Sequence, residues 1–216
     1  MKQSVLAGLL LAVVSGTLTA RAQQASGGRT VSESQAVLES WNDIGRKLIA
    51  MAEDFPEDKY DFKPNPAQRS FAEGLLHACG VNYYFTNVVK GEKPPAEENP
   101  KRELFKTKSD VVAYVKKSFA DGADAIKAKG DKGMGDVVTD PYSHDKVRVA
   151  DYAYGFIEHS GEHYGQLVVY YRVAGMVPPE SRPKKQSAIS ELRFRSPLSE
   201  QVLCGIPGTL RRYAGT

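Results

Sequence analysis

Cysteine is scarce in this chain, and its scarcity excludes two classes of small protein. Only two cysteines, Cys79 and Cys204, occur among the 216 residues. Disulfide-dense scaffolds and Cys/His zinc knuckles need more cysteines at closer spacing. Cys79 lies within an apolar helical pattern, so we expect a buried free thiol there. A bridge to Cys204 is the alternative, because export would permit disulfide formation.

The sequence also lacks the patterns of a β protein. No stretch alternates apolar and polar residues over the length of a strand, and no Asn-Gly pair indicates a hairpin turn. We therefore expect an all-helical domain.

A concentrated positive charge is missing as well. The formal net charge is +3, but the two positive charges of residues 1–22 and the net +4 of residues 184–216 leave −3 for residues 23–183. A nucleic-acid-binding protein would gather Lys and Arg on one folded face. We therefore expect no nucleic-acid partner.

One long apolar run stands near the start of the chain. Residues 5–14 are apolar, follow Lys2 and precede the small residues of Ala20-Arg21-Ala22. This pattern predicts a secretory signal peptide, residues 1–22, that is cut after Ala22. The run is too short to span a bilayer comfortably, so we expect no stable membrane insertion after cleavage. The mature protein would be periplasmic or secreted, with a folded domain over residues 23–183 and a basic, low-order tail over residues 184–216.

Four stretches have the periodicity of amphipathic helices, and we expect them at residues 32–54, 70–89, 109–130 and 152–173. In the first stretch, apolar residues recur at alternating spacings of four and three: Val37, Trp41, Ile44, Leu48, Met51 and Phe55. Helices with one apolar stripe bury it best by packing side by side. The connecting segments, residues 56–69, 90–108 and 130–148, are long enough for crossovers or for short extra turns. The sequence thus predicts an all-α four-helix bundle with long crossover loops.

The fourth helix gives two positions of its apolar stripe to histidine. His159 and His163 are four residues apart within the sequence EHSGEHYGQ, on a stripe with Tyr152, Phe156, Gln166, Tyr170 and Val173. A buried imidazole needs partners for both ring nitrogens, and two protonated imidazoles on adjacent turns repel each other. A bound divalent cation would resolve both problems. A His-x3-His pair is a common way for one helix to provide two nitrogen ligands to a metal ion.

A third ligand is expected from a facing helix. His77 is the only other histidine in a helical segment, whereas His144 falls in a loop and is expected at the surface. Three histidines from two helices would leave at least one coordination position open for water or substrate. In the alternative interpretation, the histidines only form hydrogen bonds within the core.

Glu162 completes a second pattern. His159 to His163 match His-x-x-Glu-His, the inverted zinc-protease motif, in which Glu is a general base. That motif also needs a carboxylate ligand far downstream, but only 53 residues follow His163, and their acidic residues lie in or beside the tail. Glu162 is therefore a candidate for proton transfer outside a peptidase site, or else a solvated or outer-shell residue.

Two segments together resemble the DinB-like (damage-inducible) superfamily. Residues 156–179, FIEHSGEHYGQLVVYYRVAGMVPP, are similar to its last bundle helix, with a His-x3-His-x-Gly-Gln pattern and an Arg-x-x-Gly-x-x-Pro-Pro ending. Residues 60–85 resemble its connector and second helix, and the resemblance covers about residues 32–183. It implies a bundle that holds zinc, nickel, iron or manganese on His77, His159 and His163. It also implies that homodimers are common.

The resemblance further implies chemistry at the metal, since several relatives transfer or isomerise substrates with low-molecular-weight thiols. Two features depart from the family. Export would remove this chain from such thiols, and Glu162 stands where many relatives have another histidine. We therefore expect a metal-dependent hydrolase or transferase with an unknown small-molecule substrate. A non-catalytic metal- or ligand-binding protein is the alternative.

Overall fold

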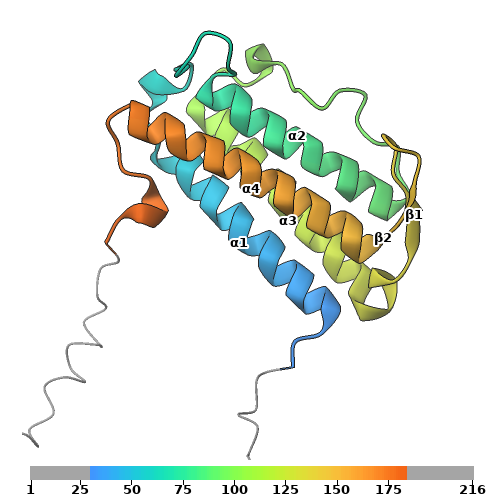
Figure 1. Ribbon diagram of the computed structural model, residues 1–216. Helices are drawn as coiled ribbons and strands as arrows, with labels where there is room; N and C mark the ends of the chain where they lie inside the picture. The colour runs from blue at the N-terminus through green and yellow to red at the C-terminus, as the bar shows by residue number, and fades with distance from the viewer. Residues whose placement is uncertain (1–29, 184–216) are drawn as a thin grey trace, which may run out of the picture.

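The structure, a computed structural model, describes residues 30–183, and four long helices make up most of it (Figure 1). These are α1 (Glu33–Asp54), α2 (Phe71–Lys90), α3 (Lys108–Met134) and α4 (Val149–Val173). The prediction of an all-α four-helix bundle is confirmed. The predicted signal peptide and tail lie outside the described residues, as does Cys204. No described helix combines the length and the apolar character that a membrane span requires.

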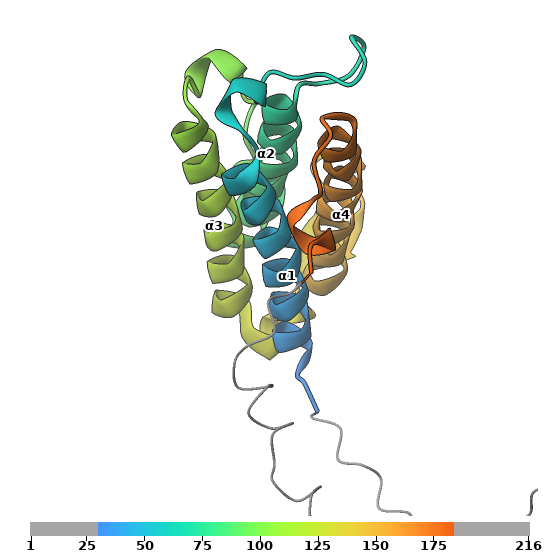
Figure 2. The same ribbon diagram turned by 90° about the vertical axis from the view of Figure 1, so that its left-hand side faces the viewer.

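The four helices run in two directions, as Figures 1 and 2 show. α1 and α4 run one way, and α2 and α3 run the other way. α1 packs against α3 and α4, and α2 also packs against α3 and α4. Because α2 and α3 are parallel, residues 91–107 return along the outside of the bundle from the end of α2 to the start of α3.

Side-chain caps define where α2 and α3 begin. Ser70 and Glu73 form a capping box at the start of α2, in which each side chain accepts a hydrogen bond from the other residue's backbone N–H. Thr107 and Asp110 do the same for α3. The predicted start of the third helix at Ser109 was therefore two residues late, because Thr107 is the capping residue.

The end of the third helix also differs from the prediction. Gly130 does leave helical geometry, with a φ of 56°, but a further helical turn continues to Met134. Glycine tolerates this left-handed conformation without the steric cost of a Cβ atom. The expected stop at Gly130 is thus a kink.

A small hairpin that the sequence did not predict follows α3 and is an addition to the all-α bundle. β1 (Val137–Thr139) pairs antiparallel with β2 (Lys146–Arg148), with Val138 opposite Val147. Each strand has three residues, which is too short for alternation to be recognised. Three short 3-10 helices complete the connections: η1 (Glu57–Lys59), η2 (Arg102–Leu104) and η3 (Pro179–Ser181).

The predicted stripe of α1 forms one side of the core, and all six of its residues are buried. Trp41 is the largest side chain of this stripe and is completely buried. The indole Nε1 donates a hydrogen bond to the Phe119 carbonyl at 2.9 Å, and its ring centroid lies 5.1 Å from that of Phe85. α3 approaches this indole closely through Gly122, where an added Cβ atom would overlap the Trp41 ring.

The stripe of α4 is only partly as predicted. Tyr152, Phe156, His163 and Tyr170 are buried, but Val173 is 58% exposed. Near its C-terminal end α4 buries Leu167 and Tyr171, and the Tyr171 hydroxyl donates to the Met51 carbonyl at 2.9 Å. An ideal α-helix has 3.6 residues per turn, slightly more than the 3.5 residues of a four-three stripe, so the buried face drifts along a long helix.

Cys79 is a fully buried free thiol, as expected. Burial raises the pKa of this thiol to about 12, although a hydrogen bond with Ser118 acts in the opposite direction. Its surroundings therefore disfavour the reactive thiolate.

Two glycine substitutions should change stability in opposite directions. Gly122→Ala should lower the free energy of unfolding by about 1–3 kcal/mol, because the new methyl group overlaps the Trp41 ring. Gly155→Ala, within α4, should raise the free energy of unfolding by about 0.5–1 kcal/mol, because alanine favours a helix more than glycine does. The added Cβ meets no side chain and no other element within 4 Å. Urea unfolding of both variants in EDTA measures the two effects. A stabilised Gly122→Ala variant would contradict the packing described for Trp41.

Candidate metal centre

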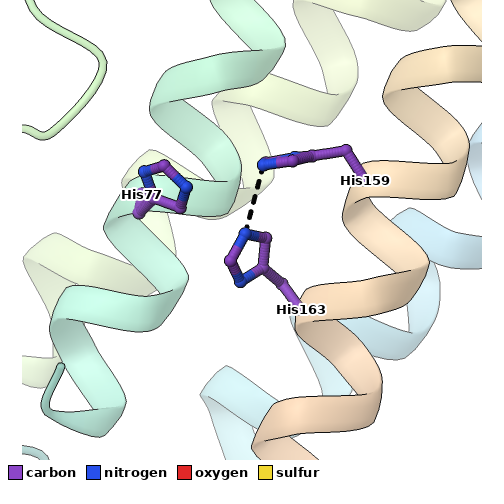
Figure 3. A group of neighbouring side chains, drawn as sticks. All are labelled: His77, His159 and His163. Atoms are coloured by element: carbon purple, nitrogen blue, oxygen red, sulfur yellow. Dashed lines mark hydrogen bonds between the residues drawn. The ribbon is translucent and has the colours of Figure 1, made fainter. Parts of the chain in front are cut away.

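The three helical histidines meet between α2 and α4 (Figure 3). His159 and His163 project from successive turns of α4, and His77 reaches them from α2. Their ring centroids lie 4.5 Å apart for the pair on α4, and 5.3 and 4.7 Å from His77 to His159 and His163. The antiparallel packing of α2 on α4 thus brings together residues more than 80 positions apart in the sequence.

The donor atoms have the spacing that a metal ion needs. One ring nitrogen of each histidine lies within 4.8 Å of the other two, so the group could hold a metal ion. The Nε2 atoms of His159 and His163 are 3.1 Å apart. Two nitrogens bound to a tetrahedral zinc at its usual bond length lie about 3.3 Å from each other. The pair on α4 is therefore already spaced like two ligands of one ion.

Gln166 fixes the orientation of one ring. Its Oε1 atom lies 3.2 Å from Nδ1 of His163 and can accept a hydrogen bond from it. With the proton on Nδ1, the Nε2 atom of His163 has a free lone pair directed at His159. Outer-shell hydrogen bonds of this kind set the tautomer of ligand histidines.

Two ring nitrogens have no such partner. Nδ1 of His77 and Nδ1 of His159 are buried, and no hydrogen bond to them occurs among residues 30–183. Histidines that merely hydrogen-bond within a core would pair both nitrogens. These unpaired atoms therefore count against the purely structural alternative.

The surroundings keep the three imidazoles neutral. Burial lowers the pKa of His159 to about 4, with further lowering by His163 and His77. Burial is also the main cause that lowers the pKa of His77 and of His163; a hydrogen bond to Gln166 opposes it at His163. Neutral imidazole is the form that binds metal.

A buried polar network lies behind His159. The Ser160 hydroxyl donates to Asn82 Oδ1 at 3.3 Å, and Asn82 Nδ2 donates to the Ser118 hydroxyl, also at 3.3 Å. Ser118 in turn donates to the Cys79 carbonyl at 3.1 Å. These side chains come from α4, α2 and α3 and are almost completely inaccessible to solvent. The network therefore ties the three helices together at the level of the histidines.

Two recesses flank the histidines. The first, which we call the His163 recess, has a volume of about 600 Å³ and includes Arg69, Gly74, His163, Gln166 and Tyr170 in its lining. The second, the His159 recess, has a volume of about 390 Å³ and is more apolar. Its lining includes Val81, Tyr142, Tyr152, Phe156 and His159. A ligand in either recess could thus contact one histidine of α4.

Glu162 and His144, the other two residues weighed from the sequence, lie outside this centre. Glu162 is on the exposed face of α4 and lines neither recess. His144 is exposed in the turn between β1 and β2. Tyr152 and Tyr170 each line one recess, whereas Tyr84 stacks against Tyr142 with ring centroids 4.8 Å apart.

Sequence reasoning missed the contribution of the crossover segment. Glu98 and Asn99 from this segment act on the pKa of His77 and raise it, against the effect of burial. The segment lies directly on α2 at Gly80, where an added Cβ atom would overlap the Glu98 carbonyl oxygen. A glycine within a helix one turn after His77 was the signal that another piece of backbone passes there.

Comparisons with known proteins agree with this architecture. A family model described as the DinB superfamily matches residues 41–167, which is more than half of the chain and includes all three histidines. The crystal structure of a DinB-like protein from Bacillus cereus ATCC 10987 is similar, with a TM-score of 0.56 and 14% sequence identity over 66% of this chain and 93% of that chain. At this identity the likeness shows a shared fold. No curated protein matched the chain.

The buried network makes a testable contribution to stability. Ser160→Ala removes the donor to Asn82 Oδ1, and the stranded oxygen should lower the free energy of unfolding by about 1–3 kcal/mol. Ser109→Ala is the matched control, because Ser109 is an exposed residue of α3 and should change stability by less than about 0.5 kcal/mol. Chemical denaturation of both variants makes the comparison. Equal stability of the two would show that the network contributes nothing.

Proposed function

The chain belongs to the DinB superfamily, and on that premise we propose that it is a metal-dependent enzyme that holds one divalent ion on His77, His159 and His163. One observation carries the proposal: three neutral imidazoles from two helices converge until their donor atoms lie within 4.8 Å of one another. The unsatisfied ring nitrogens support it, because a hydrogen-bonded core would not leave them unpaired.

The donor set narrows the choice of ion. Imidazole nitrogens suit zinc, iron and nickel, whereas manganese prefers carboxylate oxygens. No carboxylate among residues 30–183 belongs to the three-histidine group. Zinc, iron and nickel therefore fit better than manganese, and the availability of the ion would decide among them.

An open site favours catalysis over a structural role. Structural zinc is usually enclosed by four protein ligands, whereas catalytic zinc keeps a position for water or substrate. A divalent ion at such a position lowers the pKa of bound water or polarises a substrate oxygen. Around it, Gln166 holds the His163 ring, and the two recesses give a small molecule access. These features support hydrolase or transferase chemistry.

Metal analysis tests the proposed ligands. His77→Ala, His159→Ala and His163→Ala should each lose tightly bound zinc after dialysis, whereas the wild type should retain about one equivalent per chain. His144→Ala is the matched control, because this exposed histidine lies in the hairpin turn, and it should retain zinc like the wild type. Full retention by any of the three ligand variants would remove that residue from the site.

Catalysis needs its own test, because a carrier protein would bind metal equally well. Hydrolysis of 4-nitrophenyl acetate should disappear when the wild type is stripped of metal and return when zinc is added back. A protein that binds zinc but shows no metal-dependent turnover of this ester would instead support the non-catalytic alternative.

We also propose that the chain is exported and cleaved after Ala22, on the pattern of residues 1–22. The purified mature protein should then begin at Gln23. Intact-mass measurement of protein from the periplasm or culture medium, with its native leader, checks this expectation. A protein that keeps Met1 in the cytoplasm would contradict it.

A further inference from the structure

Arg69 lines the His163 recess without being part of the proposed metal centre. It stands immediately before Ser70, the residue that caps α2. The Tyr170 hydroxyl of α4 donates a hydrogen bond of 2.6 Å to the Arg69 carbonyl. The backbone of Arg69 is thus held against α4 at the edge of the recess, close to His163.

The guanidinium of Arg69 is not committed to a carboxylate. Its Nη2 atom donates to Asn99 Oδ1 at 3.1 Å, and no acid pairs with it among residues 30–183. Four other arginines of the domain do pair with acids: Arg46 with Glu180, Arg102 with Asp61, Arg148 with Asp151 and Arg182 with Asp54. Arg172 has no such pair either, but it lines neither recess. Arg69 therefore combines unpaired positive charge with a place at the candidate site.

The charge of the recess has one sign. Its lining contains no acidic residue, and Arg69 is its only permanently charged side chain. A dication on the histidines would add a second positive charge beside the same cavity. Such a surface attracts anions and excludes cations.

The donors suit a carboxylate better than a phosphate dianion. The first turn of α2, which could have supplied backbone N–H groups, is closed by the capping box and carries the Glu73 carboxylate. One guanidinium fork remains, and Gln166 lines the same recess. A guanidinium is a planar donor that can bind the two oxygens of a carboxylate in a bidentate manner.

We propose that Arg69 binds a carboxylate of the substrate, so that the substrate is a small organic acid whose reacting group faces the three histidines. The inference rests on the proposed metal site and names the class of molecule that this site accepts. The volume of about 600 Å³ suits a small molecule rather than a chain segment.

Binding of simple acids to zinc-loaded protein tests the proposal. Malonate, succinate and glutarate are titrated calorimetrically into the wild type and into Arg69→Gln, with the diamides of the same acids as uncharged probes. The tightest acid should bind the wild type at least tenfold better than Arg69→Gln, because a charge-assisted contact is lost. The diamides should bind both proteins equally, and Arg69→Lys should retain part of the preference.

Two controls separate this contact from other effects. Arg172→Gln removes one unpaired, exposed positive charge without changing the lining of either recess, and it should bind the acids like the wild type. The zinc content and melting temperature of every variant are measured first. The Arg69 side chain is exposed, so Arg69→Gln should keep both.

The possible failures are distinct. A wild type that binds no zinc would overturn the proposed function, and this inference with it. If zinc is retained but Arg69→Gln binds the acids as well as the wild type, only the role of Arg69 is wrong. Failure of all three acids to bind the zinc-loaded wild type would likewise overturn the assignment. An equal loss in Arg172→Gln would show a general charge effect instead of a specific contact.

Discussion

The candidate centre depends on the close, antiparallel contact between α2 and α4. Each helix alone offers an incomplete site, since α4 has two histidines and α2 has one. Gly74 of α2 lies so close to α4 that an added Cβ would be 3.3 Å from the Leu167 side chain. The Tyr170 hydroxyl and the Ser160–Asn82 hydrogen bond fix the same pair of helices on either side of that level. A shift of one helical turn along either axis would separate the donor atoms by about 5 Å.

Apolar packing on both sides stabilises this polar level of the bundle. Towards one end, Trp41 and Phe85 belong to an aromatic cluster with Phe156. Towards the other end, Phe55 stacks on Phe71 with ring centroids 3.9 Å apart, and the Tyr171 ring meets Phe55 edge-on. Buried imidazoles and amides cost free energy unless they are paired. The apolar packing in the two clusters offsets this cost. The imidazoles can therefore stay buried with ring nitrogens that are free to bind an ion.

Local periodicity explains which features the sequence could reveal. The buried stripe of α1 and the meeting of His77 with His159 and His163 both follow from helical spacing and from the tendency of amphipathic helices to pack side by side. The hairpin of β1 and β2 was missed because each strand has only three residues, too few to show a recognisable alternation. Arg69 was missed for another reason. Its importance comes from a tertiary relation, the absence of an acid partner beside a recess, which no spacing within one segment encodes.

The crossover segment links the topology of the bundle to the chemistry of the site. Parallel α2 and α3 cannot be joined by a tight turn, so residues 91–107 must travel the length of the bundle. Their route passes over α2 at Gly80 and places Asn99 against the Arg69 guanidinium. The histidines stand on rigid helices, whereas Arg69 and Asn99 stand on connecting segments. Changes in those segments would therefore alter which ligand fits while the ligand set for the ion stays intact. Under the proposed function, specificity and metal binding would thus be carried by separate parts of the fold, and only the second would be fixed by helix packing.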